Sequence, residues 1–195
     1  MITTIIFDIA KVLLRFDRDY VISCFYDGNE HELLKEKLFN GWEDMDEDLI
    51  STDDYEKKIL STLPDNLKNV ASTILNNWED TMSPPDKMVE LVQKLKSKGY
   101  KLYVLSNMTR HFIKRDYKFP FLKLFDGIVY SAHIQAVKPK PEIYEYLFKQ
   151  YSINPCECIF VDDRKENLAT GARFGMKTFL FEDNVDALRD FIFSH

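Results

Sequence analysis

The stretch TIIFDIAKVL, residues 4–13, decides the fold of this chain. It opens with a short apolar run, Ile5 to Phe7, which is long enough for a strand that is buried on both faces of a parallel sheet. Asp8 ends that run. Ligands of α/β sheets bind at the carboxyl ends of the strands, so a carboxylate at this place is a candidate functional group. The alternative interpretation is an Asp that only caps the following turn.

Two later apolar runs also end in polar residues. Ser106-Asn107 follows Tyr103-Val104-Leu105, and Asp162-Asp163 follows the run from Cys158 to Val161. Turn capping is a poor explanation for three polar strand ends in one chain. Since the first strand and the strand that ends at Asp162 are expected to be neighbours where the strand order reverses, these side chains should share one edge of the sheet.

Composition limits the classes of partner. A chain of 195 residues fits one domain, or one domain with an insertion, and 45% hydrophobic and 14% aromatic residues indicate a globular protein. The net charge of -6 argues against nucleic acid or an anionic membrane as a partner. No apolar run approaches the roughly 20 residues of a membrane span, and no signal-peptide pattern is present. The odd number of cysteines favours reduced thiols in a cytoplasmic protein over a metal or redox pair.

Residues 16–82 contain no convincing buried strand, and their apolar residues recur at helical spacing. The clearest stripe belongs to one helix: Leu67, Val70, Ala71, Ile74, Leu75 and Trp78. Ser51 to Asp54 reads as the capped start of the helix before it, and residues 19–26 and 30–39 are expected to form two more. The acidic run 43–48 is expected to be a solvated connector and not a metal site. The segment as a whole predicts a small helical bundle inserted after the first strand.

The chain then alternates between strands and helices. Pro84-Pro85 suits the start of a helix, and Gly99 stands where its C-terminal cap belongs. Strands are expected at 101–105, 127–130, 157–161 and 177–181, and helices near 110–118, 141–151, 165–174 and 184–193. This alternation predicts an α/β fold with a doubly wound, parallel, five-stranded sheet. The expected domains are a core of residues 1–15 and 83–195 and an all-helical cap of residues 16–82.

Four groups of residues could carry chemistry. Asp8 is a candidate nucleophile or metal ligand, and Ser106-Asn107 could hold an anionic oxygen, although such a pair is also a common helix N-cap. Lys138 lies in a Pro-braced loop and would become a cation for phosphate or carboxylate if it lay near Asp8. Asp162 and Asp163 repel each other unless a cation binds, so Mg²⁺ is the natural expectation.

These motifs, in this order, resemble the four signature motifs of the haloacid dehalogenase superfamily. Residues 100–181 are similar in particular to the branch that holds the α-D-glucose-1-phosphate phosphatases and the amino-terminal phosphatase domain of soluble epoxide hydrolase. The similarity rests on LSNMTR at 105–110, VKP at 137–139 with EIY at 142–144, and FVDD at 160–163 followed by Asn167. With the helical insertion, which is a cap in that family, it covers nearly the whole chain.

The resemblance implies an Mg²⁺-dependent phosphatase that acts on a small phosphorylated metabolite, a sugar phosphate being favoured. Asp8 would attack phosphorus and form an aspartyl-phosphate. Ser106, Asn107 and Lys138 would bind the phosphate oxygens, and Lys138 would also offset the charge of Asp8. The metal ligands implied by the family are Asp8, Asp163 and the backbone carbonyl of Ala10, with Asp162 behind them or reaching the ion through water.

One position departs from most phosphatases of this superfamily. They carry a second Asp two residues after the nucleophile as general acid and base, and this chain has Ala10. The proton donor is therefore unassigned, and two alternatives stay open: a catalytically silent binding or regulatory protein, and a haloacid dehalogenase. The loop near Asp44 could touch the leaving group, and so could Trp42, which could equally belong to the core of the cap. Arg110 could reach a substrate or be a solvated helix-start residue.

Overall fold

The computed structural model describes all residues 1–195. Five parallel strands form one sheet in the order β3-β2-β1-β4-β5. The strands are β1 Thr4–Phe7, β2 Lys101–Ser106, β3 Gly127–Tyr130, β4 Cys158–Asp162 and β5 Lys177–Leu180. The predicted α/β fold with a doubly wound, five-stranded parallel sheet is confirmed, and β1 and β4 are neighbours as expected. The order reverses beside β1, where such sheets bind ligands.

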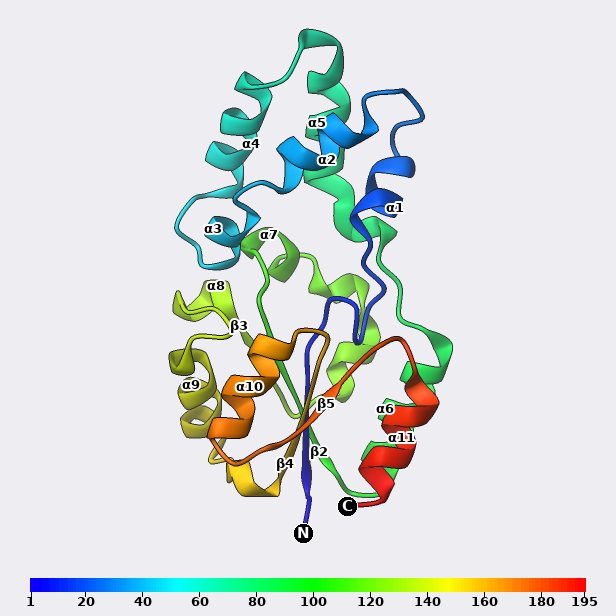
Figure 1. Ribbon diagram of the computed structural model, residues 1–195, viewed down its shortest axis with the longest axis vertical. Helices are drawn as coiled ribbons and strands as arrows, with labels where there is room; N and C mark the ends of the chain where they lie inside the picture. The colour runs from blue at the N-terminus through cyan, green and yellow to red at the C-terminus, as the bar shows by residue number, and fades with distance from the viewer.

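Helices cover both faces of this sheet (Figure 1). On one face α6 (Asp86–Ser97) and α11 (Val185–Phe193) pack over Ile5 and Phe7, and on the other α9 (Pro141–Tyr151) and α10 (Lys165–Arg173) pack over Ile6. The remaining elements after β2 are short: α7 Arg110–Ile113, η2 Asp116–Lys118, η3 Pro120–Leu124, α8 Ser131–Ile134 and η4 Pro155–Glu157. The helix expected over 110–118 is therefore broken after Ile113.

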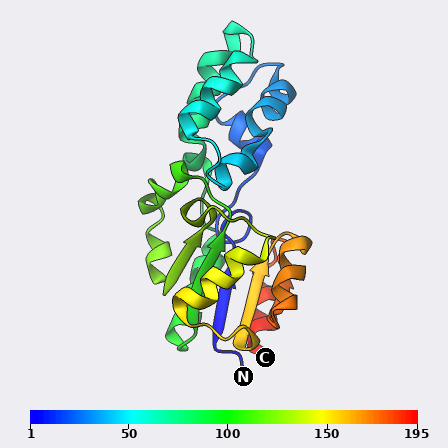
Figure 2. The ribbon, with the colours of Figure 1, turned by 90° about the vertical axis from the view of Figure 1, so that its left-hand side faces the viewer.

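Between β1 and β2 the chain is helical only, from residue 18 to residue 81, and we call this part the helical segment. Its elements are α1 Arg18–Ser23, α2 His31–Phe39, α3 Trp42–Asp46, α4 Thr52–Ser61, α5 Asp65–Asn77 and the 3₁₀ turn η1 Trp78–Thr81. Helix α5 packs against α2 and α4 through the stripe that the sequence predicted. Figures 1 and 2 show the helical segment beyond the carboxyl ends of the strands.

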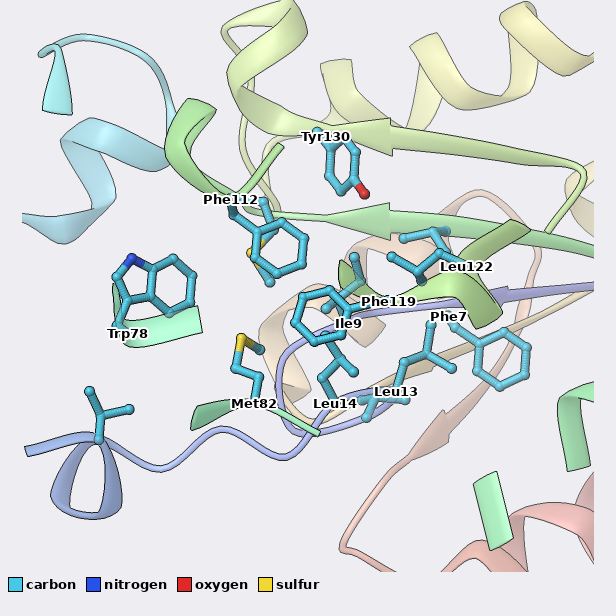
Figure 3. Close-up of a cluster of buried hydrophobic side chains, with 14 of the residues drawn as sticks. Phe7, Ile9, Leu13, Leu14, Trp78, Met82, Phe112, Phe119, Leu122 and Tyr130 are labelled. Atoms are coloured by element: carbon cyan, nitrogen blue, oxygen red, sulfur yellow. The ribbon is translucent and has the colours of Figure 1, made fainter. Parts of the chain in front are cut away.

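The two chain passages that join the helical segment to the sheet lie side by side. The N–H of Arg15 donates to the carbonyl of Ser83 at 2.9 Å, which pairs the outgoing and returning passages. One hydrophobic cluster also runs through the junction, from Phe7 of β1 past Phe112 of α7 to Trp78 of η1 (Figure 3). The helical segment is thus held over the sheet by continuous packing as well as by paired backbone.

Candidate active site

The carboxyl ends of three neighbouring strands bring the polar residues together. Phe7 is in register with Val104 of β2 and with Val161 of β4, so Asp8 emerges between the ends of these two strands. Ser106 and Asp162 are the last residues of β2 and β4. Because the strands are parallel, all three side chains reach the same edge of the sheet.

Lys138 lies at the centre of this group. The side chain is almost completely buried, and Nζ lies 2.8 Å from Oδ1 of Asp8 and 2.7 Å from Oδ2 of Asp162. Burial opposes the positive charge, but the carboxylates of Asp162 and Asp8 outweigh it and raise the pKa of Lys138 above its usual value. A permanently charged ammonium group therefore sits beside Asp8.

Two further donors meet the same oxygen of Asp8. The hydroxyl of Ser106 donates to Oδ1 at 2.7 Å, and the backbone N–H of Ile9 donates to it at 2.7 Å. The ammonium of Lys138 forms an ion pair with the same oxygen. These three contacts fix the orientation of the carboxylate, and none of them involves Oδ2.

The side chain of Asn107 holds the backbone of Lys138. Its Nδ2 donates to the carbonyl of Lys138 at 3.0 Å, and its Oδ1 accepts from the N–H of Lys138 at 2.8 Å. This two-point contact uses the whole amide group. A direct contact between the Asn107 amide and phosphate stays a prediction, while its contact with the Lys138 loop is a feature that the sequence reading missed.

Asp162 is fixed from three sides. Besides the ion pair with Lys138, its Oδ1 accepts from Nδ2 of Asn167 and from the N–H of Arg164, both at 2.9 Å. Asn167, one helical turn beyond the end of β4, thus bonds back to the strand end. Both oxygens of Asp162 are engaged and it anchors Lys138, while its neighbour Asp163 lines the cavity described below.

The acidic residues here suit a divalent metal ion. Carboxylate oxygens of Asp8, Asp162 and Asp163 lie within 4.8 Å of one another. Burial and the adjacent Asp162 raise the pKa of Asp163, and a bound cation would stabilise its charged form. The carbonyl of Ala10 accepts none of the backbone bonds of the turn that follows β1. A set of hard oxygen donors of this kind fits Mg²⁺.

A cavity of about 780 Å³ lies between these strand ends and the helical segment. Core residues and residues of the helical segment line it together. From the core these include Asp8, Ala10, Asn107, Lys138 and Asp163, and from the helical segment Arg18, Lys35, Trp42, Glu43 and Asp46. Its size suits a small metabolite enclosed by both parts of the chain.

The expectation that the acidic run 43–48 is a solvated connector is wrong in part. Residues Trp42–Asp46 form helix α3, and Met45 on it is buried. Trp42 packs edge-on against Tyr55 and Trp78 and also lines the cavity, whereas Asp44 is exposed. Asp46, not Asp44, reaches the cavity, and its Oδ1 is shielded from solvent without a hydrogen-bond partner. The sequence did contain a signal for this helix. Trp42 and Met45 are three residues apart and would lie on one face of a helix, and Asp46 falls on the same face.

Arg110 is the exposed first residue of α7 and does not line the cavity, which agrees with the helix-start interpretation. Its ion pair was not expected: Nε lies 2.6 Å from Oδ1 of Asp48 in the helical segment. Lys140 makes a similar ion pair with Glu47. Two ion pairs therefore join the chain just after α3 to the sheet-bearing part of the protein.

Comparisons with known proteins agree with this architecture. The sequence model of one family, the haloacid dehalogenase-like hydrolases, matches residues 2–175. D-ribitol-5-phosphate phosphatase of Bacteroides thetaiotaomicron is 26% identical over 95% of both chains. Bifunctional epoxide hydrolase 2 of Rattus norvegicus is 28% identical over 91% of this chain, which spans only 33% of that protein.

Solved structures show the same fold. A HAD family enzyme of Bacteroides thetaiotaomicron, in complex with magnesium and inorganic phosphate, superimposes with a TM-score of 0.74 at 22% identity. The match covers 92% of this chain and 93% of the other. In the present chain no helix is both long enough and apolar enough to cross a membrane.

Proposed function

The chain belongs to the haloacid dehalogenase-like hydrolases, and on that premise we propose that it hydrolyses a small phosphate monoester, with a sugar phosphate favoured, through an aspartyl-phosphate on Asp8. The observation that carries this proposal is the carboxylate of Asp8 at a strand end, with Lys138 and Ser106 bonded to one of its oxygens. A nucleophile and two groups that bind anionic oxygen meet there at one point.

The first step is attack by an Asp8 oxygen on phosphorus, which forms the Asp8 O–P bond while the bond from phosphorus to the leaving oxygen breaks. In the second step water attacks phosphorus, the Asp8 O–P bond breaks, and inorganic phosphate leaves. Phosphoryl transfer depends chiefly on positioning and on neutralising negative charge. Lys138 would contribute to both positioning and charge neutralisation, because its ammonium adjoins Asp8 and faces the space where the phosphoryl oxygens would lie.

Ser106 and Lys138 would bind the phosphoryl oxygens. In the structure without substrate the Ser106 hydroxyl donates to Asp8, and a phosphoryl oxygen would compete for that proton. Asn107 would contribute by holding the Lys138 backbone, as its two hydrogen bonds suggest.

The residues that would hold Mg²⁺ are Asp8, Asp163 and the carbonyl of Ala10, with Asp162 behind them. A bound Mg²⁺ would supply positive charge that offsets the charges of Asp8 and the phosphate group. The support from this chain is the cluster of carboxylate oxygens within 4.8 Å. The solved magnesium and phosphate complex of a family member agrees with this choice of ion.

The helical segment is proposed to be a cap domain, residues 16–82, over a core of residues 1–15 and 83–195. The cavity between them, about 780 Å³, would hold the group that leaves the phosphate. The substrate would be a small phosphorylated metabolite, with neither nucleic acid nor a membrane as a partner, in keeping with the net charge of -6. A cytoplasmic location is part of the same proposal and rests on three free cysteines.

The test is turnover of a panel of sugar phosphates, nucleotides and p-nitrophenyl phosphate with Mg²⁺. Wild-type protein is expected to release inorganic phosphate from several of them. Asp8→Asn is expected to abolish release, because an amide does not attack phosphorus. No release from any ester, or full activity of Asp8→Asn, would overturn the proposal.

A further inference from the structure

A phosphatase of the proposed kind needs a proton at the leaving oxygen, and the core does not supply one at the usual place. Ala10 carries a methyl group, which transfers no proton. The two core carboxylates that line the cavity, Asp8 and Asp163, are already proposed as nucleophile and metal ligand. The donor must therefore come from another element that lines the cavity.

The helical segment and the N-cap residue just before it offer four acidic residues at the cavity, and three of them are engaged or exposed. Asp17 caps α1 by accepting from a backbone N–H at 2.8 Å, and Asp19 is paired with a lysine at 2.6 Å. Glu43 is exposed. The fourth is Asp46, whose Oδ1 is shielded from solvent and has no hydrogen-bond partner.

We infer that Asp46 of α3 is the general acid and base of this enzyme, an inference that rests on the proposed function. An unpaired polar atom that is shielded from water costs free energy, and chains rarely keep one without a reason. The leaving oxygen of a bound ester would supply the hydrogen-bond partner that the Asp46 carboxyl lacks within the chain.

The position of Asp46 relative to the core is fixed by three contacts around it. The hydroxyl of Ser131 on α8 donates to the backbone carbonyl of Asp46 and itself accepts from the N–H of Met108 at 2.9 Å. The next two residues form the ion pairs Glu47–Lys140 and Asp48–Arg110. A catalytic group must be held within a few tenths of an ångström, and these contacts tie α3 to the core.

The protonation state of Asp46 suits the role. Burial, together with the negative charges of Glu43 and Asp8, raises the pKa of Asp46 to about 8, although Lys138 and Arg18 oppose the rise. His133, the titratable group of the neighbouring α8, acts on Asp48 instead. The carboxyl is thus protonated at neutral pH, and a pKa near the working pH is the most effective one for a general acid.

The proton follows a closed path through the two steps. As the bond from phosphorus to the leaving oxygen breaks, the Asp46 carboxyl gives its proton to that oxygen and becomes a carboxylate, and the alcohol leaves. In the second step the Asp46 carboxylate takes a proton from the attacking water while the Asp8 O–P bond breaks. The enzyme returns to its starting state with one ester and one water converted into alcohol and phosphate.

The test compares Asp46→Asn with wild type on two esters, p-nitrophenyl phosphate and an alkyl ester such as a sugar 6-phosphate. The nitrophenolate departs without a proton, so its kcat/KM should change less than about threefold, while kcat/KM for the alkyl ester should fall by about 10²–10⁴-fold. Because the base is also lost, the variant should show a burst of about one nitrophenolate per enzyme, followed by a slow steady state. The burst also reports that the variant is folded and that Asp8 still attacks.

The matched control is Asp44→Asn, an exposed aspartate on the same helix, which should leave both esters unchanged. The alkaline limb of the wild-type kcat/KM profile for the alkyl ester should lie near pH 8 and vanish in Asp46→Asn. Equal losses on both esters, or no loss on either, would overturn the role of Asp46 while wild-type turnover keeps the proposed function. If wild type hydrolyses neither ester, the proposed function fails and this inference fails with it.

Discussion

Lys138 and Asp8 form a buried ion pair with 2.8 Å between Nζ and Oδ1. The residues come from the first strand end and from the loop before α9, and they meet because parallel strands present their carboxyl ends at one edge of the sheet. Asp162, 2.7 Å from the same ammonium group, completes the cluster. The ammonium of Lys138 and the carboxylates of Asp8 and Asp162 stabilise one another's charged forms. A change to any one of them should therefore affect both the free energy of unfolding and turnover.

Replacing Lys138 by methionine is expected to affect both properties. The substitution leaves two buried carboxylates without their cation, which should lower the free energy of unfolding by about 3–5 kcal/mol. It also removes a donor to the phosphoryl group, which should lower kcat/KM by about 10²–10³-fold. Urea unfolding and turnover of p-nitrophenyl phosphate measure the two effects. Lys149→Met, at an exposed lysine on α9 away from the cavity, is the control, and near-normal turnover by Lys138→Met would contradict the assignment.

Asn107→Ala should act through Lys138. Loss of its two hydrogen bonds to the Lys138 backbone should loosen the ammonium and lower kcat/KM by about 10–10²-fold. Because both changes affect one unit, the double variant Lys138→Met/Asn107→Ala should be no slower than Lys138→Met alone. Additive losses in that double variant would show that Asn107 acts independently, for example by binding phosphate itself.

Removal of the metal ion should stop turnover. A chelator is expected to abolish activity, and added Mg²⁺ should restore it. Asp163→Asn removes one hard anionic ligand and should raise the Mg²⁺ concentration needed for half-maximal activity by at least about 10-fold. Asp53→Asn, an exposed aspartate far from the cavity, serves as the control for the change in net charge. Full activity in excess chelator would refute the magnesium site.

Glu79 in η1 should make stability depend on pH. It is completely buried at the junction, where its carboxylate pairs with His111 and Arg115, each at 3.2 Å, and with Lys118 at 3.3 Å. Burial alone would raise the pKa of Glu79, but the hydrogen bonds and charges of its partners, His111 foremost, hold that pKa below its usual value. A folded pKa below the unfolded one means that the carboxylate stabilises the fold above the unfolded value, about 4.3.

That contribution should be lost as the pH falls through the folded pKa of Glu79. The difference in free energy of unfolding between wild type and Glu79→Gln should therefore be largest near pH 7 and shrink below about pH 4. Chemical unfolding across this range measures it. A difference that grows as the pH falls would show that the sign is wrong.

Strand ends were predictable from the sequence because two local rules agree there. A short apolar run gives a buried strand, and the polar residue that follows it lands at the binding edge of a parallel sheet. Asp8, Ser106 and Asp162 obey both rules, and the structure places them together. Gly99, with φ of 86° after α6, follows the cap rule in the same way.

The role of α3 was not predictable by those rules, because it depends on contacts between distant parts of the chain. A run of acids around Met45 has the composition of a solvated loop, and contacts with Tyr55, Trp78 and α8 are what bury one side of α3. The ion pair of Arg110 was missed for the same reason, since its partner Asp48 lies in the helical segment. No local pattern reports which residues a helical insertion brings to a cavity.

The most direct measurement is the location of the phosphoryl group during turnover. Enzyme mixed with Mg²⁺ and p-nitrophenyl phosphate is quenched in acid, digested and examined by peptide mass spectrometry, with Asp46→Asn included because its second step should be slow. Phosphate on the peptide that carries Asp8, and none on the Asp8→Asn protein, is the expected result. Turnover by wild type with phosphate found on another residue, or sustained turnover by Asp8→Asn, would contradict an aspartyl-phosphate on Asp8.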